Sequence, residues 1–211
     1  MKGTSVKIQM KVSIGPIQSW KSRGGKVRRT LVLAALNLGF LGCGHASELK
    51  VGDPAPGINL LTDEGKKFNL DSRKGQWTVL YFYPKAETPG CTKQACAFRD
   101  GLSEIHSLGA EVFGVSGDSV DALKKFKENH KLNFTLLADP SLVAIKLYGT
   151  KIPLLKVSKR WTFIIGPDLK IRSIEKDVDP VLDAKRITEL LKKFQSQAKI
   201  ESFDPPALDQ S

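Results

Sequence analysis

The chain has 211 residues, 41% of them hydrophobic, which is enough for one domain of ordinary size with a sizeable core. Its net charge of +11 is concentrated at the start, because residues 1–46 hold eight of the 33 Lys and Arg and no acidic residue. The rest of the chain has 25 basic against 22 acidic residues and no basic patch interleaved with aromatics, which argues against nucleic-acid binding.

The first 46 residues have the three parts of an export signal. A basic segment ends at Arg28-Arg29, an apolar run of 12 residues covers 31–42 with one interruption at Asn37, and small residues follow at 44–46. This run is too short to span a bilayer, which needs about 20 apolar residues. We therefore predict a leader over 1–46, a mature domain over 47–211, and export to the bacterial periplasm or envelope.

Several alternatives for the leader stay open. The Arg28-Arg29 pair resembles a twin-arginine signal, and Cys43 weakly resembles a lipoprotein site. A long leader that is poor in acids also suits two-step import into a plastid, ending in the thylakoid lumen. A start codon assigned too early is a further alternative, although the apolar run would remain.

Strands and helices are predicted to alternate after the leader. A hairpin is expected from 59–61 and 67–69, and the apolar run 78–83 is typical of a central strand covered on both faces. Further on, the pattern predicts helices over 91–108, 120–128, 142–148 and 183–197, and strands over 111–116, 134–137, 161–165 and 171–174. The tail from about 198 is expected to be loose. This order predicts an α/β domain with a mixed central sheet flanked by helices.

Cys91 has the most informative surroundings in the chain. It follows the predicted strand 78–83 and the loop 84–90, and it opens the predicted helix. The unpaired amides of a helix N-terminus carry partial positive charge, which favours the thiolate form of a cysteine placed there. Because the thiolate is the nucleophile, this placement predicts an attacking cysteine.

A second cysteine, Cys96, lies five residues later in the same predicted helix. Two cysteines this close are no disulfide framework and look like a working pair. In an intact helix their Cα atoms would be ~8.6 Å apart, whereas a disulfide needs about 7 Å or less. A bond between them therefore requires the first turns to unwind. The alternatives are that the bond never forms, or that Cys96 is a packed small residue between Ala95 and Ala97.

The segment 81–100 closely resembles the Q-type, or bacterioferritin-comigratory-protein, peroxiredoxins, and the similarity runs from about 49 to 194. It rests on the motif Pro84-x-x-x-Thr88-x-x-Cys91 followed by Cys96. The resemblance implies a thioredoxin-like fold and a thiol-dependent peroxidase that reduces hydrogen peroxide and organic hydroperoxides. It makes Cys91 the peroxidatic residue and Cys96 the resolving residue, which captures a sulfenic acid as an intramolecular disulfide.

The resemblance also implies roles for three supporting residues. The Thr88 hydroxyl would hydrogen-bond the thiolate and the peroxide, and Pro84 would form an apolar wall that limits water. Arg160, at the start of a late strand, would hold the thiolate and polarise the O–O bond. No cofactor is implied, and the expected partners are a peroxide and thioredoxin or a similar dithiol, with the protein a monomer. The turn at 166–169 departs from the family pattern, which alters the hairpin there.

Other chemistries fit the residues less well. A zinc site needs four ligands, and His106 and His130 lack ligand spacing to the cysteine pair. Arg99 could be a second functional arginine, with a surface ion pair to Asp100 as the alternative. A thiol–disulfide oxidoreductase on the same fold would want a Cys-x-x-Cys pair, and a non-catalytic holdase or interaction module would leave the motif around Cys91 without a role.

Overall fold

The computed structural model describes residues 48–201, so the predicted leader, its cleavage site and Cys43 lie outside the described residues. The described part holds a seven-stranded sheet in the order β2-β1-β5-β4-β3-β6-β7. Its strands are β1 (Asn59–Thr62), β2 (Lys67–Asn69), β3 (Trp77–Phe82), β4 (Ala110–Ser116), β5 (Thr135–Ala138), β6 (Trp161–Ile165) and β7 (Ile171–Glu175). Its helices are α1 (Pro89–Ser107), α2 (Val120–His130), α3 (Val143–Leu147) and α4 (Asp183–Glu201), with a 3-10 helix at Leu70–Arg73.

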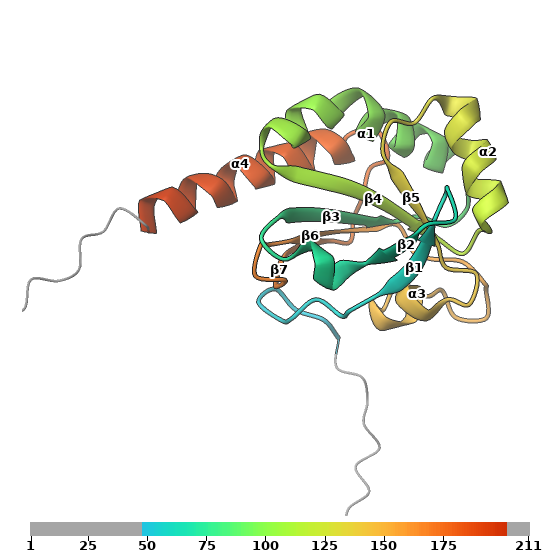
Figure 1. The fold of residues 1–211 in the computed structure, drawn as a ribbon, viewed down its shortest axis with the longest axis horizontal. Coiled ribbons are helices and arrows are strands. Elements are labelled where there is room, and N and C mark those ends of the chain that lie inside the picture. The colour runs from blue at the N-terminus through green and yellow to red at the C-terminus, as the bar shows by residue number, and fades with distance from the viewer. Residues whose placement is uncertain (1–47, 202–211) are drawn as a thin grey trace, which may run out of the picture. The chain divides into compact units, whose positions relative to one another are not determined.

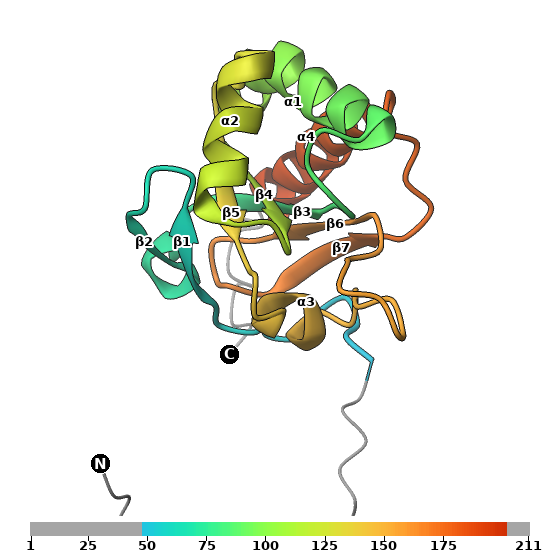
Figure 2. The same cartoon turned by 90° about the vertical axis from the view of Figure 1, so that its right-hand side faces the viewer.

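The sheet is mixed, and β3 lies in its interior between β4 and β6. Strands β3, β4 and β5 run parallel, while β6 pairs antiparallel with β3 and β1 pairs antiparallel with β5. Helices α1, α2 and α4 cover one face and α3 lies on the other, as Figures 1 and 2 show. The predicted mixed sheet flanked by helices is therefore confirmed.

Strand β3 is apolar except for Thr78, because each of its faces meets a separate core. Successive side chains of a strand point to opposite faces. Val79 and Tyr81 accordingly pack among α1, α2 and α4, with residues such as Phe98, Phe126 and Ile187. Leu80 and Phe82 pack on the other face, where Ile145, Tyr148 and Phe163 are among the buried residues. The continuous apolar run therefore marks a strand that is buried on both sides.

The strands and helices predicted from the sequence are present, with ends that differ by a few residues. The 3-10 helix at Leu70–Arg73 was not predicted; the Asn69 side chain caps it by accepting from the Asp71 amide at 2.6 Å. Helix α4 continues to Glu201, four residues past the predicted end at 197, and the chain after it lies outside the described residues. At the turn 166–169, Leu169 takes a left-handed φ of 60°. No helix between residues 48 and 201 is both long and apolar enough to cross a membrane.

Gly114 of β4 is the glycine most tightly enclosed by the core. It lies opposite Tyr81 in the β3–β4 register, and a Cβ built on it would lie 2.6 Å from the Tyr81 hydroxyl. We predict that Gly114→Ala lowers the free energy of unfolding by about 1–3 kcal/mol, because the buried ring has to move to make room for the methyl group. Urea unfolding of the purified variant measures this loss.

Gly101→Ala is the matched control. Its Cβ would meet the Ala184 methyl carbon at 3.7 Å, an ordinary contact, and Ala is the better helix former. This variant should be as stable as the wild type or more so. Equal unfolding midpoints for the two variants would contradict the packing argument.

Candidate active site

Cys91 lies in the first turn of α1, two residues after the helix begins at Pro89. It is 1% exposed and belongs to the core beneath α1. The amides of a first helical turn have no intrahelical acceptor, so they point toward the space in front of the helix. The structure therefore places the sulfur where the helix favours negative charge.

Arg160 supplies a full positive charge to the same sulfur. Its Nη2 donates to Cys91 Sγ at 3.4 Å, although the two residues are far apart in the sequence. The arginine immediately precedes β6, which pairs with β3 so that Trp161 lies opposite Phe82. A Cβ on Gly90 would lie 3.2 Å from Nη2, so glycine leaves room for the guanidinium. The sheet thus brings together the two residues that the sequence singled out.

Arg160 is hydrogen-bonded to Gln94, which is in turn hydrogen-bonded to Asp183. The sequence analysis identifies neither Gln94 nor Asp183. Arg160 Nη1 donates to Gln94 Oε1 at 2.6 Å, and Gln94 Nε2 donates to Asp183 Oδ2 at 2.7 Å. The Thr162 hydroxyl donates to the same Oδ2 at 2.8 Å. Gln94 is three residues after Cys91, hence on the same helix face. That spacing is the one signal that could have identified it.

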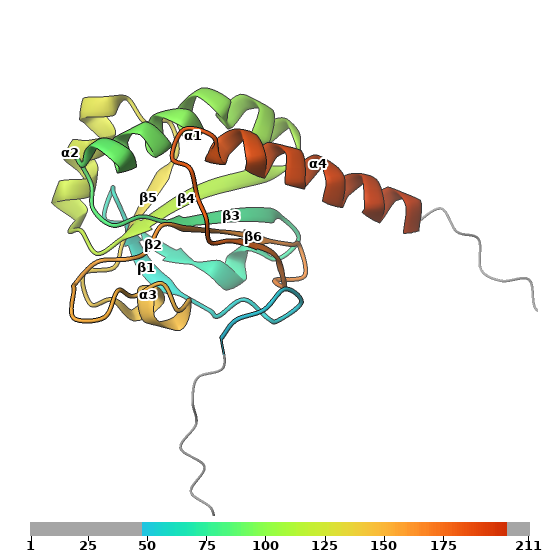
Figure 3. The same ribbon diagram turned by 180° about the vertical axis from the view of Figure 1, so that it is seen from behind.

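Burial dominates the electrostatics of Asp183. It raises the pKa of this carboxyl to about 6, while the hydrogen bonds from Gln94 and Thr162 act in the opposite direction. Asp183 begins α4, which packs along α1 (Figure 3). The carboxylate is therefore brought to the site by the last helix of the described chain.

The loop between β3 and α1 is held at two points by neighbouring elements. The Ala86 amide donates to Asp118 Oδ2 at 2.8 Å, and the Ser116 hydroxyl donates to the same oxygen. Glu87 takes a left-handed φ of 63°. Its carboxylate bonds to Asn129 and His130 of α2, and the hydrogen bond to His130 is the main reason that its pKa lies below the usual value. These contacts fix the chain that enters α1.

Thr88 and Pro84 belong to this loop as predicted, but the Thr88 hydroxyl has a partner other than the cysteine sulfur. Its hydroxyl donates to the Lys85 carbonyl at 2.9 Å, so that proton is not given to the sulfur here. The oxygen keeps its lone pairs, which can accept a hydrogen bond from a bound peroxide. Pro84 is half-buried where β3 ends and has no amide N–H to donate.

Cys96 lies in the same intact helix as Cys91, and both cysteines are free thiols. Cys91 is buried, whereas Cys96 is half-buried. Arg99 forms an ion pair with Asp100 at 2.8 Å and donates to the His130 carbonyl at 2.7 Å. Its contacts therefore belong to the packing of α1 against α2.

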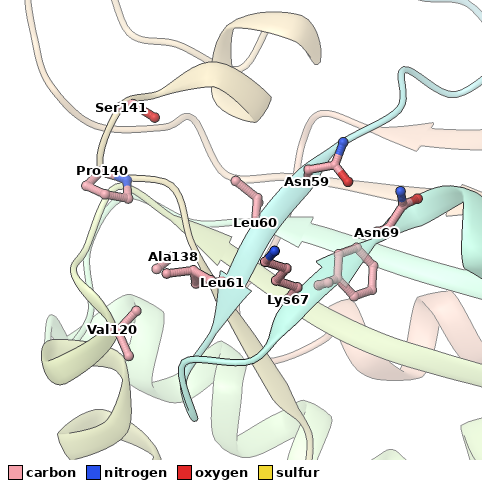
Figure 4. Close-up of a pocket in the computed structure, with 10 residues that line it drawn as sticks. Asn59, Leu60, Leu61, Lys67, Asn69, Val120, Ala138, Pro140 and Ser141 are labelled. Atoms are coloured by element: carbon pink, nitrogen blue, oxygen red, sulfur yellow. The ribbon is translucent and has the colours of Figure 1, made fainter.

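A separate pocket of about 660 Å³ lies beside the β1–β2 hairpin (Figure 4). Its lining includes Leu60, Leu61 and Val120, and it contains none of the predicted site residues. The pocket therefore does not coincide with the candidate site around Cys91. Within residues 48–201, no three His, Cys, Asp or Glu side chains are grouped so that they could hold a metal ion.

Comparisons with known proteins agree with this geometry. The model of the AhpC/TSA family matches residues 51–174. A putative peroxiredoxin Bcp of Coxiella burnetii is 41% identical over 132 residues, which are 60% of this chain and 87% of that protein. A chloroplastic peroxiredoxin Q of rice (Oryza sativa subsp. japonica) is 39% identical over 73% of this chain and 69% of its own.

Solved structures show the same fold. The crystal structure of peroxidoxin BcpB from Mycobacterium tuberculosis superposes with a TM-score of 0.65 at 32% identity, over 69% of this chain and 97% of that one. A peroxiredoxin Q structure from Xanthomonas campestris gives 0.61 at 28% identity, over 64% and 90% of the two chains. The thioredoxin-like fold expected from the sequence is therefore confirmed. The chain belongs to the AhpC/TSA family of thiol-dependent peroxidases, in its Bcp and peroxiredoxin Q branch.

Proposed function

We propose that Cys91 is the residue that reduces the peroxide and that Cys96 then resolves it as an intramolecular disulfide. The observation that supports this most strongly is the Arg160 guanidinium 3.4 Å from a cysteine sulfur in the first turn of a helix. A buried, cation-paired thiol at a helix N-terminus has the features of a nucleophile rather than of a packing residue. The membership of the chain in a peroxidase family supplies the reaction.

In the first step the Cys91 thiolate attacks the terminal oxygen of the peroxide. An S–O bond forms, the O–O bond breaks, and the other oxygen leaves as water or an alcohol after taking up a proton. Arg160 stabilises the thiolate before attack and the charge that develops on the leaving oxygen. The sulfur is left as a sulfenic acid.

In the second step the Cys96 sulfur attacks the sulfenic sulfur, an S–S bond forms, and water leaves. The standing helix does not allow this, because Cα atoms five residues apart are ~8.6 Å from each other and a disulfide needs about 7 Å or less. The start of α1 therefore has to unwind after oxidation. Pro89 and Gly90 at the helix start suit a segment that leaves and re-enters the helix.

The disulfide then returns to two thiols at the expense of a dithiol such as thioredoxin. The reductant thiolate attacks one sulfur, and its second thiol releases the protein in reduced form. We place this cycle in a monomer, because both cysteines that it needs lie on one helix of one chain. No cofactor takes part in any step.

We further propose that residues 1–46 are an export leader that is removed before Ser47. The basic segment, the apolar run and the small residues at 44–46 support this. The destination is the bacterial periplasm or envelope, with import into a plastid as the alternative. The observation that supports the alternative is the word chloroplastic in the names of the two rice relatives.

The first prediction concerns the two cysteines. Cys91→Ser should abolish peroxide consumption in the presence of dithiothreitol or thioredoxin, because a serine hydroxyl is not ionised near neutral pH. Cys96→Ser should keep the first oxidation step, stall at sulfenic acid, and over-oxidise more readily. Stopped-flow oxidation followed by mass spectrometry distinguishes the two variants.

The wild type serves as the control for resolution. One equivalent of peroxide should give a monomer that is lighter by two hydrogens, with reduced helix content. Turnover by Cys91→Ser would remove the assignment of the nucleophile. Stable sulfenic acid or intermolecular dimers in the wild type would make Cys96 a packed spectator.

The second prediction concerns Arg160. Arg160→Met keeps much of the apolar stem and removes the charge beside Cys91 Sγ, so the thiolate loses its cation. The rate of the first oxidation, measured by stopped flow under single-turnover conditions, should fall by orders of magnitude. Arg99→Met is the matched control, because that guanidinium contacts Asp100 and His130 instead, and its rate should stay within a factor of two. The reverse result would transfer the role to Arg99.

The third prediction concerns the leader. Protein isolated from its native cell should begin at or near Ser47. N-terminal sequencing decides this directly. A lipid-blocked Cys43 would indicate the lipoprotein route, and an intact Met1 would overturn the export proposal.

A further inference from the structure

Asp183 is a buried carboxylate to which the catalytic cycle described above assigns no task. It is 2% exposed, and it lies at the start of α4. Its Oδ2 accepts from Gln94 and Thr162, while its Oδ1 is buried and has no hydrogen-bond partner among the described residues. It also lines a small pocket of roughly 160 Å³ near the surface, together with Asp177 and Arg186.

Keeping a carboxylate in this position is costly. Burial disfavours its charged form, and no cation of residues 48–201 forms an ion pair with it, since Gln94 lies between it and Arg160. Leucine or asparagine would avoid that cost. A role that needs a group able only to accept hydrogen bonds, and never to donate them, would explain why an acid is present.

Gln94 indicates what that role is. An amide side chain has a donor end and an acceptor end, so it can be fixed in either of two orientations. An ionised carboxylate only accepts hydrogen bonds, and a guanidinium only donates them. Because Gln94 lies between Asp183 and Arg160, its NH₂ has to face the carboxylate and its oxygen has to face the guanidinium. Arg160 Nη1 is thereby held at 2.6 Å, and Nη2 is left for Cys91 Sγ.

The same contact opposes the unwinding that resolution needs. Gln94 lies between Cys91 and Cys96 in α1, is fully buried, and is part of the turn that has to open. When that turn leaves the helix, the bonds from Gln94 to both Asp183 and Arg160 are lost. The Asp183 carboxylate then keeps only the Thr162 hydroxyl, and a buried charge that loses a donor is destabilised.

We propose that Asp183 is a positioning residue that acts through Gln94 to hold Arg160 against Cys91 and to keep the first turns of α1 folded. It therefore speeds the reaction with peroxide and slows formation of the Cys91–Cys96 disulfide. The second half rests on the resolving role proposed for Cys96. The first half rests only on the reaction of Cys91.

The test measures the two steps separately in Asp183→Ala, using the full chain. Stopped flow gives the rate of the first oxidation, and acid quenching followed by mass spectrometry gives the rate of disulfide formation. We expect the first rate to fall about tenfold or more and the second to rise several-fold. Over-oxidation at high peroxide should fall accordingly. A residue that served only the stability of the fold would not move the two rates in opposite directions.

Two further variants make the test specific. Asp183→Asn keeps an oxygen that can accept from Gln94, so it should recover most of the first rate. If Asp183→Ala does not fold, Asp183→Asn replaces it in the test. It should then show a smaller fall in the rate of first oxidation and a smaller rise in the rate of disulfide formation. Asp177→Ala removes an exposed carboxylate from the same pocket and should leave both rates within a factor of two.

A double-mutant cycle with Gln94→Leu tests the route. If Asp183 acts through Gln94, the double variant should be no slower in the first oxidation than Gln94→Leu alone. Additive losses, parallel changes in both rates, or rates unchanged in Asp183→Ala would each overturn the proposal. Failure of the proposed cysteine cycle is distinguishable, because it would appear as turnover by Cys91→Ser or as a wild type without the internal disulfide. In the latter case the first rate alone decides the positioning role.

Discussion

The contact between Arg160 and Cys91 is the interaction on which the rest of this site depends. A thiol that is 1% exposed would ordinarily remain a neutral packing residue, because burial disfavours a thiolate. Two features oppose that cost here, namely the first turn of α1 and a guanidinium 3.4 Å from the sulfur. The helix start and the guanidinium come from different parts of the chain, and the fold has to bring both of them to the Cys91 sulfur.

The sheet supplies the alignment. Strand β3 delivers the chain into the loop before α1, and β6 pairs with β3 so that Arg160 comes alongside the helix start. Asp118 then fixes Ala86 from the end of β4, while Asn129 and His130 of α2 fix Glu87. A loop with a residue in a left-handed conformation keeps that shape only where its surroundings impose it. The entry to α1 is therefore fixed from two sides before the sulfur is reached.

The proposed cycle makes opposite demands on one helix turn. The peroxide step needs Cys91 held against Arg160, whereas the disulfide step needs the same turn to open. The chain Arg160–Gln94–Asp183 ties that turn to the beginning of α4. Its strength is thus a compromise, because a tighter hold favours the first step and a looser hold favours the second. Because Gln94 is buried and lies between the two cysteines, its contacts affect both steps.

The sequence by itself determined the order of the elements and the candidate residues for the chemistry. The apolar run of β3, the cysteine that opens α1 and the spacing of Cys96 are local patterns, and local patterns follow from periodicity and from the properties of helix ends. The sequence does not predict the 3-10 helix after β2, because four residues are too few to show a hydrophobic periodicity. The sequence also places the end of α4 too early, because the end of a helix depends on packing and capping as well as on the hydrophobic pattern. No local pattern singles out Arg160, which matches an arginine of the family that the chain resembles.

Only the tertiary structure could show that Gln94 and Asp183 form the hydrogen-bonded chain that holds Arg160. Nothing in the local sequence distinguishes Asp183 from any acidic residue at a helix start, where a carboxylate is favoured in any case. Its role depends on α4 packing along α1, on burial that removes water, and on Gln94 facing it across the gap. The Thr88 hydroxyl shows the same dependence, because its donation to the Lys85 carbonyl follows from the shape of the loop. Hydrogen bonds between residues far apart in the chain are made by the fold, so the sequence could name the candidate residues but not the contacts that hold them in place.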